Sequence, residues 1–414
     1  MRRRKPPKKI RTSRGGYSRR TSTSKPKLSI NVSAFLKILF VLLIITLCSY
    51  LIIWLINFYS VESIDYTSMN SSSSYLLGKS GKDLNKTLII FESGRGEKRK
   101  ISKAYVYIRN SKKKLGMLLY IPENLYFNEL EEDFGNKIPV SSLRYAGDFL
   151  QKGRGVEYAL WQFNQLLGIK YDSYIWFTTE SLEVFEDIYG NFSSSTVGKN
   201  LYQQEKGVEL TDSFLFLNTL SSKYSIAKSI LKSGKFKDLK GNIYSNLSFS
   251  KIARLLNDMN SQMSEYSMSA LTLENSKYTN DENSNSGDVV KVLNTVEYDK
   301  EFRRKYSKMV DKDLEKERVR IEVYNASTIS GIAAQLGRKI INSGGDVVRY
   351  GNAPELAQKT KVFVPNIDDF QNSYSLVAEI LSEKYELVNG RPEFMTTGDI
   401  IIVIGEDMRS IYSF

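Results

Sequence analysis

VRIEVYNASTISGIAAQLGRKIINSGGDVVRYG, residues 319–351, is the stretch that decides the fold of this chain. It opens with VRIEVYN, where β-branched and aromatic residues predict a strand. Apolar residues then recur at the spacing of a helix, at Ile332, Leu336 and Ile340, and Gly344 marks the end of that helix. DVVRYG predicts the next strand. A strand, a helix and a strand in direct succession indicate an α/β unit.

The unit continues to the end of the chain. KTKVFVP (359–365) predicts a third strand, NSYSLVAEILSEKY (372–385) a second helix, and GDIIIVIGED (398–407) a buried last strand. The order β-α-β-β-α-β predicts a small two-layer sandwich domain over residues 319–410.

A larger α/β domain is predicted upstream, over residues 85–310. The runs TLIIF, KAYVYI and KLGMLLYI predict strands, and their continuous apolar character predicts a sheet covered on both faces. Helical patterns alternate with one more strand, YDSYIWFT. The predicted helices are 156–168, 178–190 with Thr179 or Ser181 as its cap, 212–233 and 249–266.

The N-terminal part predicts a membrane anchor. Ile38–Tyr59 is a run of 22 residues without a charge, which is long enough to cross the hydrocarbon core of a bilayer. Residues 1–28 hold twelve Lys or Arg and no acid, so the net charge of +13 belongs almost entirely to this tail. The positive-inside rule then predicts a cytoplasmic tail (1–33), a single span (34–59) in the plasma membrane and an extracytoplasmic remainder.

Three polar segments are predicted to connect these parts. Residues 60–84 are rich in serine and predict a stalk, and residues 277–288 predict a long surface loop or a linker. Residues 297–319 carry mixed charges at spacings of three and four, which predicts a solvated, semi-rigid spacer helix that ends over 311–318.

The composition excludes several kinds of site. The chain has no histidine, and its one cysteine, Cys48, lies inside the predicted span. A histidine base, a Cys/His zinc site and an intramolecular disulfide are therefore excluded. Chemistry outside the membrane must rely on Asp, Glu, Lys, Arg, Ser, Thr or Tyr.

The loop after the strand VRIEVYN offers two interpretations. Asn325 ends the strand, and Ser327, Thr328 or Ser330 can cap a helix whose first turn contains Gly331. Small residues there would let the helix pack closely on the sheet. The alternative is an anion held by free amide groups at the helix N-terminus.

Residues 319–407 resemble the C-terminal domain of LytR-CpsA-Psr (LCP) family proteins. The resemblance rests on the strand, an Asn followed by small residues, Gly-x-Ala-Ala, and a closing strand that ends in Gly405, Glu406 and Asp407. Asn325, Ser327 and Gly331 belong to this signature. ALWQFNQLLGIKYDSYIWFTTESLEVFEDIYG (159–190) is similar to part of the family's larger domain.

The resemblance implies an extracytoplasmic cell-envelope protein. Members of the family transfer glycopolymers from a polyprenyl-diphosphate lipid to peptidoglycan, with arginines that grip the pyrophosphate and acidic residues that bind magnesium. In this sequence LLYIPENLYF (118–127) takes the place of the family's Ile-Pro-Arg-Asp loop. Ile121 and Pro122 match, but Glu123 replaces the arginine and Asn124 the aspartate.

Two further parts of the family site are altered. Arg99 or Lys100 can stand for the arginine of an early Arg-x-Asp element, but no aspartate occurs between Asp83 and Asp133. No arginine occurs in 209–220, where an Arg-x-Arg element is expected. These differences predict a degenerate catalytic domain, a pseudoenzyme without catalytic residues or a cofactor. Magnesium is expected only if the chain is an active transferase.

A few charged residues remain as candidate contacts for phosphate or polymer. Arg144, Lys152 and Arg154 lie in LRYAGDFLQKGRG (143–155), a predicted loop, although they can equally be ordinary surface charge. Spacing does not support a metal site made of Glu92, Glu123 and Asp148.

Three functions follow from this. The favoured one is a membrane-anchored, non-catalytic protein that binds a cell-wall glycopolymer, a lipid-linked precursor or an envelope partner. The alternatives are an active glycopolymer transferase and an anchored scaffold that uses only its C-terminal module. The basic tail is expected to contact anionic lipid, and a role in nucleic-acid binding is not favoured.

Overall fold

The protein is described from a computed structural model, which covers residues 32–68, 75–78, 83–127, 137–192, 212–284, 286–310 and 312–409. Contacts within the chain divide it into two compact units, Met1–Tyr50 and Leu51–Phe414.

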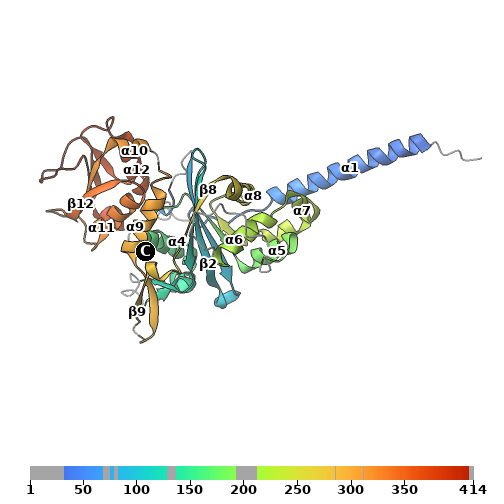
Figure 1. Ribbon diagram of the computed structural model, residues 1–414, viewed down its shortest axis with the longest axis horizontal. Coiled ribbons are helices and arrows are strands. Elements are labelled where there is room, and N and C mark those ends of the chain that lie inside the picture. The colour runs from blue at the N-terminus through green and yellow to red at the C-terminus, as the bar shows by residue number, and fades with distance from the viewer. Residues whose placement is uncertain are drawn as a thin grey trace, which may run out of the picture. The chain divides into compact units, whose positions relative to one another are not determined.

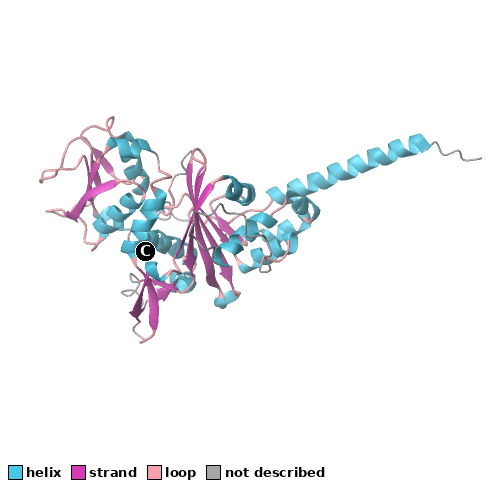
Figure 2. Cartoon of the chain, viewed as in Figure 1, coloured by secondary structure: helices cyan, strands magenta, loops and turns pink. Residues whose placement is uncertain are grey.

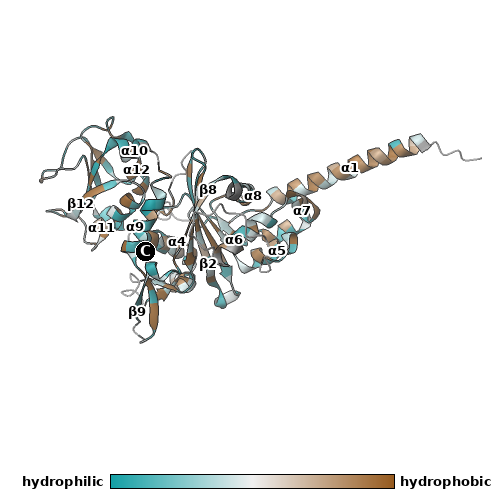
Figure 3. Ribbon diagram, in the orientation of Figure 1, coloured by the Kyte–Doolittle hydropathy of each residue, from teal (hydrophilic) through white to brown (hydrophobic). Residues whose placement is uncertain are grey.

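The helix α1, Val32–Tyr59, contains the predicted span. Its residues Ser33–Tyr59 are long and apolar enough to cross a membrane, and the most apolar part of this run is not buried against other parts of the protein. In Figure 3 most of its length has the colour of hydrophobic residues. The helix is therefore consistent with the predicted anchor.

A six-stranded sheet forms the centre of the larger domain (Figure 1). The strand order is β7-β6-β1-β2-β3-β8. The three strands predicted between residues 87 and 121 pair in an antiparallel meander, whereas β6 pairs with β1 and β8 pairs with β3 in parallel. The strands are β1 Leu84–Ser93, β2 Lys100–Asn110, β3 Leu115–Pro122, β6 Ser173–Phe177, β7 Ile243–Ser245 and β8 Ser267–Thr272.

Helices cover both faces of this sheet, as predicted (Figure 2). Along β1, Leu88 and Ile90 belong to one hydrophobic core, and Ile89 and Phe91 belong to the core on the other face. This alternation follows from the two-residue period of a strand. On the first face lie α3 Leu143–Leu150, α4 Gly155–Leu167 and α9 Thr295–Tyr306, and on the second lie α5 Thr179–Tyr189, α6 Asp212–Lys223 and α8 Phe249–Glu265.

Helix ends follow local chemistry. Gly168 ends α4 in the left-handed region with φ = 57°, a conformation that glycine adopts without steric cost. The cap of α5 is Thr178, whose hydroxyl accepts a hydrogen bond from the amide of Ser181. The predicted caps, Thr179 and Ser181, are therefore wrong, because both residues lie inside α5.

The described residues of 277–288, which are 277–284 and 286–288, form neither a free loop nor a linker. They contain the 3-10 helix η5, Ser276–Tyr278, and the strand β9, Thr279–Asn283, which pairs with β10, Val289–Leu293, in an antiparallel hairpin. Two short strands complete this sheet in the order β5-β4-β10-β9, with β4 at Leu125–Phe127 and β5 at Ile138–Pro139.

The predicted spacer helix is part of the core. Its residues form α9 and α10, Lys312–Glu317. Tyr298, Phe302 and Tyr306 are buried on one side of α9, with ring centroids 5.6 and 5.2 Å apart along the row. Three aromatics spaced by four residues lie on one helix face, and the charged side chains of Lys300, Arg303 and Arg304 between them are exposed.

The predicted stalk also differs from the structure. In its described parts, 60–68, 75–78 and 83–84, Val61, Tyr75 and Leu76 are buried. Ile64 forms a parallel bridge with Tyr244 beside the large sheet. The chain therefore packs against the larger domain directly after α1, because its scattered apolar residues contact residues that are distant in the sequence.

The C-terminal unit has the predicted order of elements with one addition. Its five-stranded sheet has the order β12-β11-β15-β13-β14, and the extra strand β14, Glu386–Val388, pairs in parallel with β13. The other elements are β11 Arg320–Asn325, α11 Ile332–Asn342, β12 Asp346–Asn352, β13 Lys361–Phe363, α12 Gln371–Ile380 and β15 Ile400–Ile404. The α/β fold class predicted for both domains is thus confirmed.

Polar contacts join the C-terminal unit to the larger domain. Arg338 of α11 donates to both carboxylate oxygens of Asp299, at 2.6 and 2.9 Å. The same guanidinium donates to the carbonyls of Gln165 and Leu166 at the end of α4, both at 2.9 Å. A cation on the last carbonyls of a helix interacts favourably with its dipole.

Two glycines set the close approach of α3 and α4. A Cβ atom added at Gly147 would lie 2.4 Å from the Cβ of Tyr158 and 2.8 Å from the Cα of Gly155. We expect Gly147→Ala to lower the free energy of unfolding by about 2 kcal/mol, because backbone and a Cβ atom must move apart. Thermal unfolding measures this. Gly351→Ala is the control, since nothing lies within 4 Å of the position its Cβ would take, and equal losses in the two variants would contradict the prediction.

Candidate functional site

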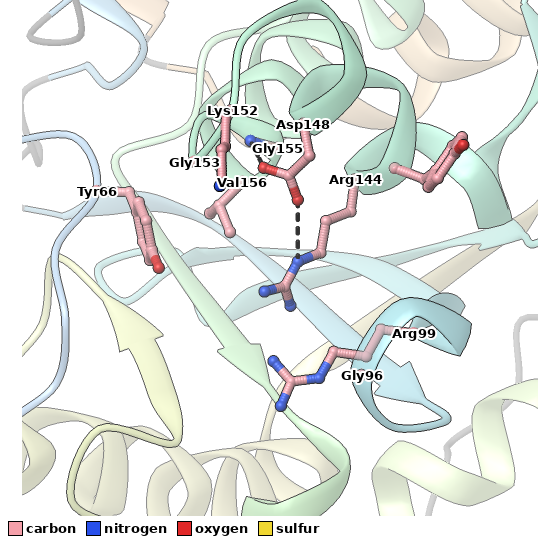
Figure 4. Close-up of a pocket in the computed structure, with 10 residues that line it drawn as sticks. Tyr66, Gly96, Arg99, Arg144, Asp148, Lys152, Gly153, Gly155 and Val156 are labelled. Carbon is pink, nitrogen blue, oxygen red and sulfur yellow. Dashed lines mark hydrogen bonds and ion pairs between the residues drawn. The ribbon is translucent and has the colours of Figure 1, made fainter.

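A pocket of about 810 Å³ lies where β1 ends, β2 begins and α3 turns toward α4. Figure 4 shows the guanidinium groups of Arg99 and Arg144 directed into the same space, with Tyr66 across from them. The lining residues are Tyr66, Gly96, Arg99, Arg144, Tyr145, Asp148, Lys152, Gly153, Gly155 and Val156.

Arg144 is the most enclosed cation of the pocket. It projects from α3 and forms an ion pair with Glu92, whose side chain is completely buried at the end of β1. Its guanidinium carbon lies 5.5 Å from the ring centroid of Tyr244 and 6.0 Å from that of Trp176. Burial raises the pKa of Glu92, and Arg144 opposes that rise. The charged form of each of these two side chains is therefore stabilised by the other.

Arg99 reaches the pocket from the start of β2. It donates to Glu180 of α5 at 2.8 Å. Its Nε atom and the Oε2 atom of Glu92 are buried, and neither has a hydrogen-bond partner among the described residues. A buried donor and a buried acceptor without partners favour a ligand that can both donate and accept hydrogen bonds.

The rim of the pocket is aromatic and basic. Tyr145 is exposed on α3, and Lys152 is exposed in the turn before α4. Asp148 holds this turn because its Oδ1 atom accepts a hydrogen bond from the amide of Gly155 at 2.9 Å. Burial raises the pKa of Tyr66, so its hydroxyl stays protonated and can donate.

Of the three cationic residues that were predicted to contact phosphate or polymer, two line this pocket. Arg144 and Lys152 line the pocket, whereas Arg154 precedes α4 and pairs with Glu157 and, at 2.8 Å, with Gln151. The segment was predicted to be a loop, but most of it is the helix α3. Arg99, which the family resemblance offers with Lys100 for the arginine of an early element, also lines the pocket, whereas Lys100 is not among the lining residues. Tyr66 is a lining residue that sequence reasoning missed, because it lies in the segment predicted to be a stalk, far from Arg144 in the sequence.

The loop LLYIPENLYF has a structural role. Pro122 ends β3, Glu123 and Asn124 form a turn, and β4 follows. Glu123 lies 3.6 Å from Lys100, with side chains that are 43% and 56% exposed, so this ion pair contributes little stability. The backbone carbonyl of Glu123 also accepts from the amide of Ser141 at 2.9 Å. Glu123 is not among the residues that line the pocket.

The carboxylates near the pocket do not fit a magnesium site. Glu92 is paired with Arg144, and Asp148 accepts from Gly155 with one oxygen while the other lies 4.0 Å from Arg144. Within the described ranges, no group of three or more His, Cys, Asp or Glu side chains is placed to share one ion. A hard cation needs several free oxygen ligands around it.

The signature loop of the C-terminal unit is held by its own side chains. Asn325 Oδ1 accepts from the amide of Ser327 at 2.9 Å and from its hydroxyl at 2.7 Å. The helix α11 starts after Gly331, which has φ = 76°, and no side chain caps it. The caps predicted at Ser327, Thr328 and Ser330 are therefore wrong, because Ser327 instead completes a turn around Asn325.

The alternative anion site at this loop is filled by the chain itself. The amide of Thr328 donates to Glu406 Oε1 at 2.6 Å. The neighbouring Asp407 accepts from the amide of Thr360 at 2.9 Å and from its hydroxyl at 2.7 Å. The acidic residues after the last strand thus hold two loops in place.

Comparisons with known proteins identify the C-terminal part. Residues 318–407 match the model of the LytR cell envelope-related transcriptional attenuator family. No curated protein matches the sequence significantly.

Solved structures show a weaker likeness. A TagT structure from B. subtilis has 14% sequence identity and a TM-score of 0.34, with 60% of this chain and 98% of that chain covered. TagT bound to LI-WTA has 14% identity and a TM-score of 0.35, and covers 60% and 97% of the two chains. The LytR-CPS2A-psr family protein YwtF (TagT) with bound octaprenyl pyrophosphate lipid has 14% identity and a TM-score of 0.33, also over 60% and 97%. At these scores the likeness does not by itself define the function of this chain.

The strand, helix and strand that open the C-terminal unit, together with the turn at Asn325, lie within residues 318–407. This unit matches the LytR C-terminal domain family, as its sequence predicted.

Proposed function

We propose that this chain is a membrane-anchored cell-envelope protein of the LCP type. Its extracytoplasmic α/β domain binds an anionic glycopolymer, or the lipid-linked precursor of one, in the pocket of Arg99 and Arg144, and does not transfer it. Support for the cell envelope comes from the LytR C-terminal domain match and from the apolar helix α1.

The observation that carries the binding proposal is the convergence of Arg99, Arg144 and Lys152 on one pocket with an aromatic rim. Glu180 and Glu92 already balance the charges of the two arginines, so these side chains offer fixed hydrogen-bond donors rather than net charge. Such donors suit the hydroxyl groups of sugars. For Lys152 no described residue provides an ion pair, so its charge is available to a phosphate on the polymer.

The non-catalytic part of the proposal rests on the loop after β3. Transfer from a diphosphate requires cations where negative charge develops on the leaving group. Here Glu123 and Lys100 cancel each other at the surface, and the described carboxylates near the pocket lack the arrangement for a divalent ion. Active transfer remains the second candidate because Arg99 and Arg144 share one pocket.

Binding by the full-length protein in lipid nanodiscs tests the first part. Lys152→Glu is expected to weaken binding of a soluble poly(glycerol phosphate) about tenfold, since a repulsive charge replaces an attractive one at the rim. Tyr145→Ala is expected to weaken it several-fold through lost contact area. Both side chains are exposed, so both variants should fold, and Lys359→Glu is the matched control on the C-terminal unit.

A transfer assay tests the second part. The same protein is incubated with a lipid-diphosphate-linked glycan, magnesium and peptidoglycan, and no product is expected. Product that disappears in Lys152→Glu would establish the transferase instead. Unchanged polymer binding in Lys152→Glu and Tyr145→Ala would move the binding site to the C-terminal module, as in the scaffold hypothesis.

A further inference from the structure

One short segment of the body is strongly basic. Residues 223–240, KYSIAKSILKSGKFKDLK, contain six lysines and a single acid, Asp238. Outside the N-terminal tail the rest of the chain is close to neutral, so this segment is an exception. It forms the helix α7, Ile226–Leu231, and the 3-10 helix η4, Ser233–Leu239.

The segment has a buried side and an exposed side. Ser229, Ser233, Phe236 and Leu239 are buried and fasten it to the body. The lysines at 228, 232, 235, 237 and 240 are exposed. Between them two large apolar side chains, Ile226 and Leu231, are 55% and 70% exposed. Exposed apolar side chains among lysines are typical of a surface that lies on a membrane interface.

This surface is tied closely to the end of the apolar helix. Phe58, in the last turn of α1, packs on Phe236 with ring centroids 5.7 Å apart, and Glu62 lies 3.5 Å from the ammonium of Lys240. The amide of Ser245 donates to the carbonyl of Ile64 at 2.9 Å. Because consecutive Cα atoms are about 3.8 Å apart, the few residues after α1 leave η4 no room to move far from the point where the chain leaves the bilayer.

We propose that α7 and η4 form a docking surface for anionic lipid headgroups on the extracytoplasmic side of the membrane that α1 crosses. Ile226 and Leu231 enter the interface, and the lysines contact the headgroups. Carboxylates partly oppose this charge, since Asp187 lies 3.0 Å from Lys235 and Glu62 lies near Lys240, but the lysines outnumber them. The docking would hold the body in one orientation above the bilayer, independently of the polymer pocket.

The test uses a spin label on α7 of the full-length protein. Ala227→Cys is labelled in a Cys48→Ser background and reconstituted into vesicles of phosphatidylcholine, with or without phosphatidylglycerol. We expect the label to become accessible to oxygen and protected from a water-soluble nickel reagent only when phosphatidylglycerol is present. A label at the exposed Met395, introduced by Met395→Cys, should not respond.

Removing lysines from α7 and η4 should weaken the docking of this surface on the membrane. The ratio of docked to free label is expected to fall about fivefold for each lysine removed at low salt. The variant is Lys235→Gln, Lys237→Gln and Lys240→Gln, and the matched control changes three other exposed lysines, Lys291→Gln, Lys300→Gln and Lys359→Gln.

Two results would overturn the proposal. One is equal protection of the label in both kinds of vesicle. The other is protection that appears only when soluble poly(glycerol phosphate) is added to phosphatidylcholine vesicles, because the lysines would then be a polymer site and not a membrane surface.

Discussion

Replacing Lys86 by methionine is expected to lower the free energy of unfolding by about 3 to 5 kcal/mol at neutral pH. Lys86 is buried on β1, with its ammonium 3.4 Å from Glu379 of α12 and 3.8 Å from Asp172. The side chain of Asp172 is only 2% exposed, and its Oδ1 atom has no hydrogen-bond partner among the described residues. Methionine fills a similar volume but removes the cation that pairs with this carboxylate.

The stability lost in the Lys86→Met variant should depend on pH. Burial raises the pKa of Asp172 from 3.8 to about 6 even though Lys86 opposes the rise. A carboxyl group whose pKa is raised by folding contributes stability that is fully present below pH 3.8 and is lost as the pH rises through 6. Without Lys86 the pKa of Asp172 rises further, so the variant should lose more stability at pH 8 than at about pH 5.

Other charged groups around Lys86 do not change this direction. Tyr306 and Glu379 face it, and Lys170 lies in the same cluster. Burial lowers the pKa of Lys170 to about 7, so it supplies only part of a charge near neutral pH. It binds the carbonyl of Glu379 at 2.9 Å instead of Asp172.

The double variant gives the control for this prediction. Asp172→Asn removes the charge that Lys86 balances, so Lys86→Met together with Asp172→Asn should be more stable than Lys86→Met alone. Denaturant unfolding at pH 5 and pH 8 measures both effects. A pH-independent loss, or no rescue by Asp172→Asn, would show that Lys86 acts through packing alone.

Replacing Arg144 by leucine is the second change with a large expected effect, again about 3 to 5 kcal/mol. Glu92 is completely buried, and Arg144 is the cation that pairs with it. The pKa of Glu92, already raised by burial, would rise further without this partner, so the variant should be relatively more stable in mild acid. Trp176 lies 6.0 Å below the guanidinium, so its fluorescence reports the change.

Two comparisons separate a charge effect from a general defect. Adding Glu92→Gln to Arg144→Leu should restore much of the lost stability, since the buried charge is gone. Arg95→Leu removes an exposed ion pair with Glu183, whose partners are 65% and 53% exposed, and should cost only about 0.5 kcal/mol. Equal losses for Arg95→Leu and Arg144→Leu would contradict the assignment of the pair as buried and interdependent.

Regular elements could be predicted because their signals are local. The periods of β1, β2 and β3 and the helical spacing in α4, α5 and α11 lie within single short stretches. The C-terminal unit was predicted almost completely, since its helical spacing is local and its buried strand β15 is a short apolar run between Gly398 and Gly405. Its polar signature, however, was assigned to a helix cap, whereas Asn325 and Ser327 bond to each other.

The polar segments were mispredicted for one physical reason. A charged or serine-rich sequence is solvated unless partners elsewhere cover its few apolar residues, and those partners cannot be read from the segment itself. In α9 the aromatic row of Tyr298, Phe302 and Tyr306 was visible in the sequence, but the core that buries it is made by distant elements.

The sequence by itself therefore determined the apolar helix, the two α/β units and the family of the C-terminal unit. Only the tertiary structure decided which charges meet. Glu92 and Arg144, Arg99 and Glu180, and Lys86 and Glu379 lie 52, 81 and 293 residues apart in the chain. Backbone periodicity is a local property, whereas ion pairs, pockets and docking surfaces depend on which elements pack together, and that choice is made by the whole core.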